Sequence, residues 1–177
     1  MNSKHNTYLY FISGKLGAGK TTLAKDIAEK KKAIFISEDL WLSQLFPDAV
    51  NTFDDYLLYS KRVRSVVSPH AIALLQQGVS VVFDFAGNTP KDRSWVKFII
   101  DHANVPHVLH YIMASDERCR SQFKKRNRNL PKGSKIVSDL EFDAINRYFI
   151  PPEQHEGFNI EYHSFLKFML KTKKSAF

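Results

Sequence analysis

The segment that most constrains how this chain can fold spans residues 8–21. An apolar run of strand length, residues 8–13, leads directly into the spacing G-x-x-x-x-G-K-T at residues 14–21. An amphipathic segment follows, with Leu23 and Ile27 on the same helical face. A glycine-rich loop without a function would need neither the strand before it nor the helix after it. We therefore expect a phosphate-binding loop in a chain that binds a nucleoside triphosphate.

The residue types in this loop suit the chemistry of phosphate binding. Glycines let phosphate oxygens approach backbone N–H groups, and the start of the next helix adds unpaired N–H groups and a positive dipole end. Lys20 is expected to reach the β- and γ-phosphates, and the Thr21 hydroxyl is expected to ligate Mg²⁺. The predicted nucleotide-binding residues of the loop are Gly14, Gly17, Ala18, Gly19, Lys20, Thr21 and Thr22.

Composition limits the kind of protein that this chain can be. The 177 residues suit a single domain, 1–177, and no apolar run reaches the ~18 residues that a membrane span needs. The single cysteine, Cys119, excludes an intrachain disulfide and is interpreted as a packing residue. The polar start of the chain has no signal-peptide core, so we expect a cytoplasmic protein. The seven histidines show no H-E-x-x-H or Cys/His pattern, so a structural zinc ion is not expected.

The formal net charge of +8 favours an anionic partner. Nucleotide phosphates account for much of this excess, and nucleic acid is the alternative partner. Lys61, Arg62 and Arg64 form a basic cluster in a long, mostly helical arm at residues 51–77. This cluster either helps to hold an anionic substrate or is a solvated face. Pro69 is expected to kink this helical arm or to divide it in two.

Acidic residues follow two of the expected strands. Asp39 comes just after the strand at 33–37, and in a parallel sheet it would lie at the edge where ligands collect. A carboxylate facing the γ-phosphate there could accept the proton of an attacking hydroxyl. The alternative is that Asp39 caps the next helix, although Ser37 or Glu38 could do so instead.

The strand at 79–84 is hydrophobic and ends in Asp84. Such a strand matches a Walker B element, in which the carboxylate sits near Mg²⁺ directly or through water. The spacing after the phosphate-binding loop leaves room for one intervening strand, which strengthens the assignment. Further strands are expected at 107–113 and 158–163, and a terminal helix at 165–170.

A basic helix end at 124–128, a turn-rich loop at 131–135 and a capping box at 138–141 together indicate a lid at about 126–138. The lid could bring Arg126 or Arg128 onto the transferring phosphoryl group. We assign Arg126 to catalysis and Arg128 to nucleotide binding. The alternatives are a solvated basic surface or an RNA-binding patch. The return helix after the capping box is predicted to pack through Leu140, Ala144, Ile145, Tyr148 and Phe149.

This order of elements resembles the small P-loop kinases. Within them it is most similar to the predicted ATP-dependent kinases, a group that includes chloramphenicol phosphotransferase, zeta toxins and the kinase domain of polynucleotide kinases. The residues that carry the resemblance are 14–21, Ser37-Glu38-Asp39, Val82-Phe83-Asp84, Arg126-Asn127, Tyr148-Phe149-Ile150-Pro151-Pro152 and Glu156-Gly157-Phe158. The resemblance implies a three-layer α/β P-loop NTPase fold with a parallel, five-stranded sheet and a small helical lid. It also implies Asp39 as the general base, Arg126 as the lid arginine, and Asp84 as a metal or substrate ligand.

Leu42 stands where polynucleotide kinases carry an arginine, which argues against a nucleic-acid 5′ end as the substrate. There is also no N-K-x-D guanine-reading motif and no ABC-type signature. We therefore expect a kinase that uses ATP and Mg²⁺ to phosphorylate a hydroxyl of a small-molecule acceptor, away from membranes. The alternatives are a nucleotide-dependent switch ATPase and a nucleic-acid-directed kinase.

Overall fold

A computed structural model describes residues 7–128 and 137–164. Its elements are β1 (Leu9–Ser13), α1 (Lys20–Lys31), β2 (Ile34–Ser37), α2 (Glu38–Leu45), α3 (Phe53–Gln76), β3 (Val81–Asp84), α4 (Pro90–Ala103), β4 (His107–Met113), α5 (Asp116–Arg128), α6 (Asp139–Arg147), η1 (Gln154–Glu156) and β5 (Ile160–Ser164). The predicted terminal helix and most of the predicted lid fall outside the described residues. Within the described residues, no helix is both long and apolar enough to cross a membrane.

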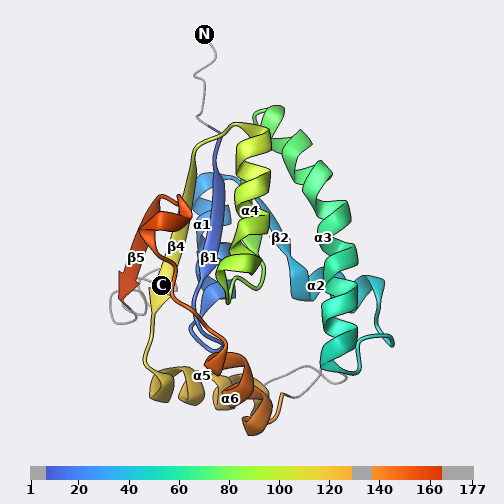
Figure 1. The fold of residues 1–177 in the computed structure, drawn as a ribbon, viewed down its shortest axis with the longest axis vertical. Coiled ribbons are helices and arrows are strands. Elements are labelled where there is room, and N and C mark those ends of the chain that lie inside the picture. Colours follow the sequence, from blue (N-terminus) through green and yellow to red (C-terminus); the bar gives the residue numbers. More distant parts are fainter. Residues whose placement is uncertain (1–6, 129–136, 165–177) are drawn as a thin grey trace.

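The five strands form one parallel sheet in the order β2-β3-β1-β4-β5 (Figure 1). β1 lies in the middle, paired with β3 on one side and β4 on the other. All strands of a parallel sheet end at the same edge, so the loops after β1, β2 and β3 meet there. The predicted five-stranded parallel sheet is confirmed, and this edge is where the predicted site residues should gather.

Helices cover both faces of the sheet, which gives the predicted three layers. Leu9 and Phe11 face the core shared with α3 and α4, whereas Tyr10 and Ile12 face the core shared with α1 and α5. This alternation is the period-two pattern of a strand that is buried on both sides. In Figure 1, α4 crosses in front of the sheet and α1 lies behind it.

The long arm is a single helix. α3 begins with a capping box between Thr52 and Asp55 and runs for 24 residues through Pro69 without a break. Of the two alternatives predicted for Pro69, a kink or a division of the arm, the division is therefore wrong, and the kink stays a prediction. A proline removes one backbone hydrogen bond, but packing on both sides of it holds the helix together. The residues that pack are Val63, Val67, Ala71 and Leu75.

The buried face of α6 differs from the prediction. The capping box between Ser138 and Glu141 is confirmed, but the anchor is Phe142, which packs on Phe123 of α5 with ring centroids 4.7 Å apart. Leu140, predicted to be buried, is 83% exposed. It lies two residues from Phe142, which is about 200° around a helix, so docking through Phe142 turns Leu140 outward. Tyr148 is also exposed, at 69%.

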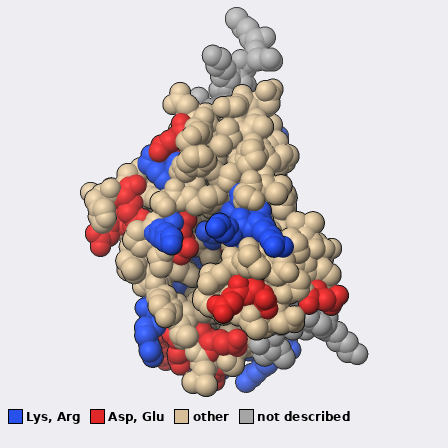
Figure 2. Space-filling view, turned by 45° about the vertical axis from the view of Figure 1, so that its right-hand side comes forward, with Lys and Arg blue, Asp and Glu red and all other residues tan. Residues whose placement is uncertain are grey.

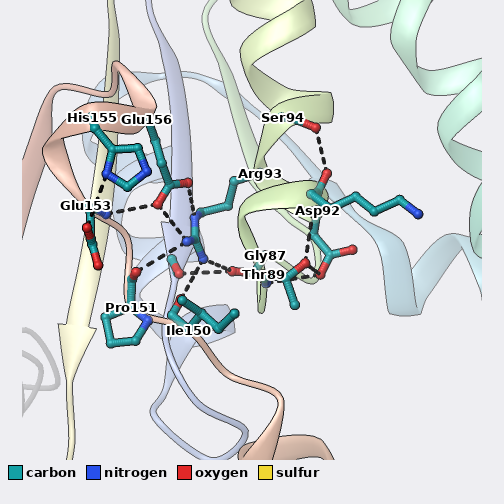
Figure 3. A network of polar contacts seen from close by, with 12 residues as sticks. Gly87, Thr89, Asp92, Arg93, Ser94, Ile150, Pro151, Glu153, His155 and Glu156 are labelled. Atoms are coloured by element: carbon teal, nitrogen blue, oxygen red, sulfur yellow. Dashed lines mark hydrogen bonds and ion pairs between the residues drawn. The ribbon is translucent and has the colours of Figure 1, made fainter.

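Arg93 in the first turn of α4 is completely buried and forms a two-pronged ion pair with Glu156 (Figure 3). Its Nε and Nη2 atoms donate to the two Glu156 carboxylate oxygens at 2.7 Å each. Its Nη1 atom also donates to the carbonyl oxygens of Gly87, at 3.0 Å, and Ile150, at 2.8 Å. Burial alone would raise the pKa of Glu156, but the hydrogen bonds from Arg93 and the backbone keep it below its usual value. The segment after α6 is thereby fastened to the loop after β3.

Removing the charge of Glu156 should expose the energetic role of this pair. The substitution Glu156→Gln leaves a fully buried guanidinium without its counter-charge, so we expect a loss of about 3–5 kcal/mol in the free energy of unfolding. Urea denaturation measures this loss. Lys97→Met is the matched control, because it removes a surface ion pair with Asp101 from the same helix and should cost less than about 1 kcal/mol. Equal effects of the two substitutions would contradict a structural role for the buried pair.

Candidate active site

The phosphate-binding loop joins β1 to α1 and is packed against α5. Gly17 has φ of +84°, and a Cβ atom at this position would lie 2.3 Å from the carbonyl oxygen of Cys119. Only glycine allows this contact, because a side chain would collide with the backbone of α5. Cys119 is fully buried, as expected for a packing residue, and burial raises the pKa of its thiol.

Two polar contacts also hold the loop backbone in place. Asn146 of α6 accepts a hydrogen bond from the Leu16 N–H at 2.8 Å and lies 3.5 Å from the Leu16 carbonyl oxygen, to which its amide donates. Lys15 forms an ion pair with Asp116 at the start of α5. Sequence reasoning missed Asn146, because its role depends on how α6 folds back onto the loop.

The Lys20 side chain folds back over the phosphate-binding loop. Its Nζ atom donates to the carbonyl oxygens of Gly14, at 2.8 Å, and Lys15, at 3.1 Å. Burial lowers the pKa of Lys20, and the charges of Asp84 and Asp39 oppose this shift. The amine is thus within the electrostatic reach of both predicted acids.

Asp84 and Thr21 lie together, as a metal site requires. Parallel pairing of β2 with β3 places Ser37 opposite Asp84, and the Ser37 hydroxyl donates to Asp84 Oδ2 at 3.4 Å. Burial raises the pKa of Asp84, while hydrogen bonds from Thr21 and Ser37 and the charge of Lys20 lower it. A hydroxyl and a carboxylate are the hard oxygen ligands that Mg²⁺ prefers, so these residues suit the ion that the sequence predicts.

Asp39 lies in the first turn of α2, and Ser37 occupies the N-cap position instead of it. The Asp39 side chain is exposed to solvent. The protein that surrounds it still displaces much of the bulk water, and this desolvation raises the pKa of Asp39. The charge of Arg126 opposes that shift most strongly. Lys20, Asp39, Asp84 and Arg126 therefore form one electrostatic cluster at the carboxyl edge of the sheet.

The two predicted lid arginines lie on different sides of α5. Arg126 lies in the last turn of α5, and its charge acts on both Asp39 and Lys20. Arg128 lies about 200° further around the same helix and lines an outer groove together with Glu117 and Arg120. The structure thus brings Arg126 to the cluster, and the assignment of Arg128 to the nucleotide stays a prediction.

Glu38 is the residue that sequence reasoning undervalued. It is 1% exposed, and its carboxylate accepts hydrogen bonds from the Ala86 N–H, the Tyr56 hydroxyl and Arg64 Nε, each at 3.0 Å. Ser60 donates a further hydrogen bond. Polar side chains at 56, 60 and 64 lie four residues apart on one face of α3, a pattern that indicates a polar contact on that face without identifying its partner.

The basic cluster predicted on the arm is divided by this network. Arg64 pairs with Glu38, donates to the Ala86 carbonyl oxygen at 3.1 Å and stacks over Trp95 at 5.0 Å. Arg62 instead lies over the Tyr59 ring at 5.1 Å. In Figure 2, which turns α3 toward the viewer, Lys and Arg gather near the middle of this face, and groups of Asp and Glu lie beside and below them.

The contact between Gly17 and Cys119 supports a direct test of the loop. Gly17→Ala forces the loop away from α5, so we expect the affinity for Mg·ATP in calorimetric titration to fall by roughly tenfold or more, about 1.4 kcal/mol. Gly78→Ala is the control, because Gly78 has nearly the same φ, +83°, but has room for a Cβ atom. It should lower stability by about 1 kcal/mol and leave nucleotide affinity unchanged. Parent-like affinity in Gly17→Ala would show that the packed loop is not the nucleotide site.

Comparisons with known proteins agree with this geometry. The model of the AAA domain family AAA_33 matches residues 9–152, and a comparison with curated protein sequences found no match. A protein from Chloroflexus aurantiacus, provisionally assigned as a kinase, superimposes with a TM-score of 0.70 at 15% identity, covering 96% of this chain and 98% of that chain. Chaetomium thermophilum Kti12, solved with ADP-AlF3, gives 0.63 at 16% identity over 88% of each chain. Mycobacterium tuberculosis APS kinase CysC, solved with AMPPNP and APS, gives 0.61 at 14% identity over 96% of each chain.

These identities show a shared fold, whereas the family match covers most of the sequence, from β1 to the segment after α6. The chain therefore belongs to the AAA domain family AAA_33 and has the fold of the P-loop kinases.

Proposed function

We propose that this protein is an ATP-dependent kinase that transfers the γ-phosphoryl group to a hydroxyl of a small-molecule acceptor. The observation that carries the proposal is the position of Asp39, an accessible carboxylate in the same electrostatic cluster as Lys20, Asp84 and Arg126. A binding loop alone would serve any nucleotide-binding protein. A solvent-accessible carboxylate beside it supplies a place where an acceptor hydroxyl can be held.

The nucleotide side of the proposed site consists of the loop N–H groups, Lys20, Thr21 and Asp84. The loop and Lys20 would hold the phosphates, and Thr21 and Asp84 would hold Mg²⁺, which neutralises phosphate charge when bound. Arg126, from the end of α5, would place its positive charge beside the phosphoryl oxygens, where negative charge develops during transfer. In this arrangement the chain contributes positioning and electrostatics, which are the main components of phosphoryl-transfer catalysis.

The acceptor side consists of α2, α3 and the loop after β3. Asp39 would orient the acceptor hydroxyl in line with the γ-phosphate and take its proton as the new P–O bond forms and the bond to the ADP oxygen breaks. Glu38 fixes the first turn of α2 to α3 and to Ala86. Asp39 therefore projects from a backbone segment that Glu38 holds in place. A carboxylate in a fixed position is better suited to catalysis than a mobile acid on the surface.

Two features support a small-molecule acceptor over a nucleic acid. Leu42 stands where polynucleotide kinases have an arginine. It is 5% exposed and belongs to the core between the sheet and α3, so a side chain at this position is not available to contact an acceptor. The face in Figure 2 also mixes both signs of charge, whereas a nucleic-acid groove needs a continuous basic surface.

Asp39→Asn tests the role that we assign to the carboxylate. The substitution keeps the shape but removes the base, so ATP affinity should stay at the parent level while transfer falls by ~10²–10⁴-fold. A loose transition state needs little help from a base, which favours the lower end of that range. Asp54→Asn, at the exposed start of α3, is the control and should change neither quantity. The assay follows ADP release with a panel of hydroxyl-bearing metabolites, and full transfer activity in Asp39→Asn would rule out this base.

The pKa of Asp39 predicts the pH dependence of the reaction. The base must be ionised, so kcat/KM should fall as pH decreases through the Asp39 pKa, which desolvation by the surrounding protein raises above its ordinary value. Arg126 lowers that pKa, so Arg126→Met should move the acid limb to higher pH. The limb should stay in place in Arg128→Met. If the acid limb of the pH profile stays in place in Arg126→Met, the charge of Arg126 does not act on the catalytic base.

A further inference from the structure

A second group of titratable side chains lies where β4 meets the edge strand β5. His110 comes from β4, and Glu161 and His163 come from β5. Parallel pairing places Glu161 opposite His110 and His163 opposite Ile112. Side chains at alternate positions of a strand share a face, so both β5 residues point to the side on which His110 lies. None of the three belongs to the proposed nucleotide or acceptor residues.

The three side chains converge on one point. His110 Nδ1 lies 2.9 Å from His163 Nε2, and each of these nitrogens lies 3.5 Å from an oxygen of Glu161. One ligand atom from each residue falls within 4.8 Å of the other two. Two ligands of a tetrahedral zinc ion, each 2.0–2.1 Å from the metal, are about 3.3 Å apart. The observed separations therefore match a metal-ligand triangle within a few tenths of an ångström.

The hydrogen bonds of the described residues do not satisfy both nitrogens of His110. His110 is 6% exposed, yet its Nε2 atom is buried without a hydrogen-bond partner among the described residues. Two facing ring nitrogens can share one proton, so one ring donates and only one lone pair is engaged. A cation between the two facing nitrogens would instead engage both of their lone pairs, with the ring proton of His110 on Nε2.

The charges around His110 also suit a divalent cation. The carboxylate of Glu161 faces the His110 ring, and the positive charge of Lys31, at the end of α1, lies near enough to act on that ring. Tyr10 stacks on the His110 ring with centroids 6.0 Å apart, and the His163 ring lies tilted to it with centroids 5.0 Å apart. Glu161 thus supplies the negative charge that offsets both Lys31 and part of a cation's charge.

We propose that His110, Glu161 and His163 form a binding site for a zinc-class divalent cation that ties the edge strand β5 to β4. Two imidazole nitrogens and one carboxylate oxygen favour Zn²⁺ and its first-row neighbours over Mg²⁺ and Ca²⁺, which prefer oxygen ligands. Three protein ligands leave a fourth position for water. No structural zinc is expected from the sequence, because the histidines show no H-E-x-x-H or Cys/His pattern. His110 and His163 are 53 residues apart and meet only through strand pairing.

Binding of Zn²⁺ to the metal-stripped full chain tests this proposal. We expect calorimetry in excess Mg²⁺ to show one equivalent of Zn²⁺ bound and the thermal unfolding midpoint to rise with Zn²⁺ and fall back with EDTA, since a ligand of the native state stabilises it. Co²⁺ bound at the same site should show the visible absorption of a tetrahedral ion. Glu161→Gln, a change at an exposed carboxylate, should weaken Zn²⁺ affinity by roughly tenfold or more, and His163→Ala should abolish the stabilisation.

His155→Ala is the matched control. His155 is an exposed histidine 3.1 Å from a carboxylate oxygen of Glu153, so it offers the same residue types without a third ligand. Its removal should leave Zn²⁺ affinity unchanged. Unfolding midpoints in EDTA report the fold of each variant separately from its metal binding. Parent protein that Zn²⁺ does not stabilise, or Zn²⁺ affinity that is equal in the parent and Glu161→Gln, would overturn the proposal.

Discussion

The relative positions of α2, α3 and the loop after β3 depend on a buried carboxylate, Glu38. A charge taken out of water costs several kcal/mol unless it is paired and fully hydrogen-bonded. Glu38 meets this requirement with donors from α3 and from Ala86, after β3. Because all of these donors must be in place at once, the start of α2, the middle of α3 and the loop after β3 can adopt few other relative positions. Asp39 follows Glu38 directly, so its position is set by the same constraint.

The remaining support comes from the end of α6 and the segment that follows it, which contact both the phosphate-binding loop and the loop after β3. Asn146 bonds the backbone of the phosphate-binding loop at Leu16. Four residues later, the Ile150 N–H donates to the Asn88 carbonyl oxygen at 2.8 Å, and Arg93 then fastens this segment through Glu156 (Figure 3). A short stretch therefore links the nucleotide side to the acceptor side, and movement of α6 at one side would be felt at the other.

Local sequence patterns were enough to predict the sheet and the nucleotide loop. The apolar run before Gly14, the acids after two strands and the capping box at Ser138 are all short-range signals, and the structure has each element in place. Features decided by tertiary packing were not predictable in this way. The buried face of α6 follows from the docking of Phe142 on Phe123, which no periodicity in a nine-residue helix could fix.

The same limit explains the missed residues. Glu38 follows a strand like any capping residue, and only the placement of α3 shows that it is buried. Arg93 looked like a residue at the start of a helix, yet its partner Glu156 lies 63 residues away. The histidine pair depends on the register between β4 and β5. Long-range pairs of polar residues carry no local signal, because each member is an ordinary surface type until its partner is known.

The central claim is that the γ-phosphoryl group of ATP passes to an organic hydroxyl and not to water. The most direct measurement uses ATP whose γ-phosphoryl oxygens carry a heavy isotope, incubated with the protein and a small-molecule extract of cells and analysed by mass spectrometry. The account predicts an organic phosphate that carries the heavy phosphoryl group and that fails to form with Lys20→Ala, which lacks the amine over the loop. Heavy label recovered only in inorganic phosphate would contradict the account and identify a switch ATPase.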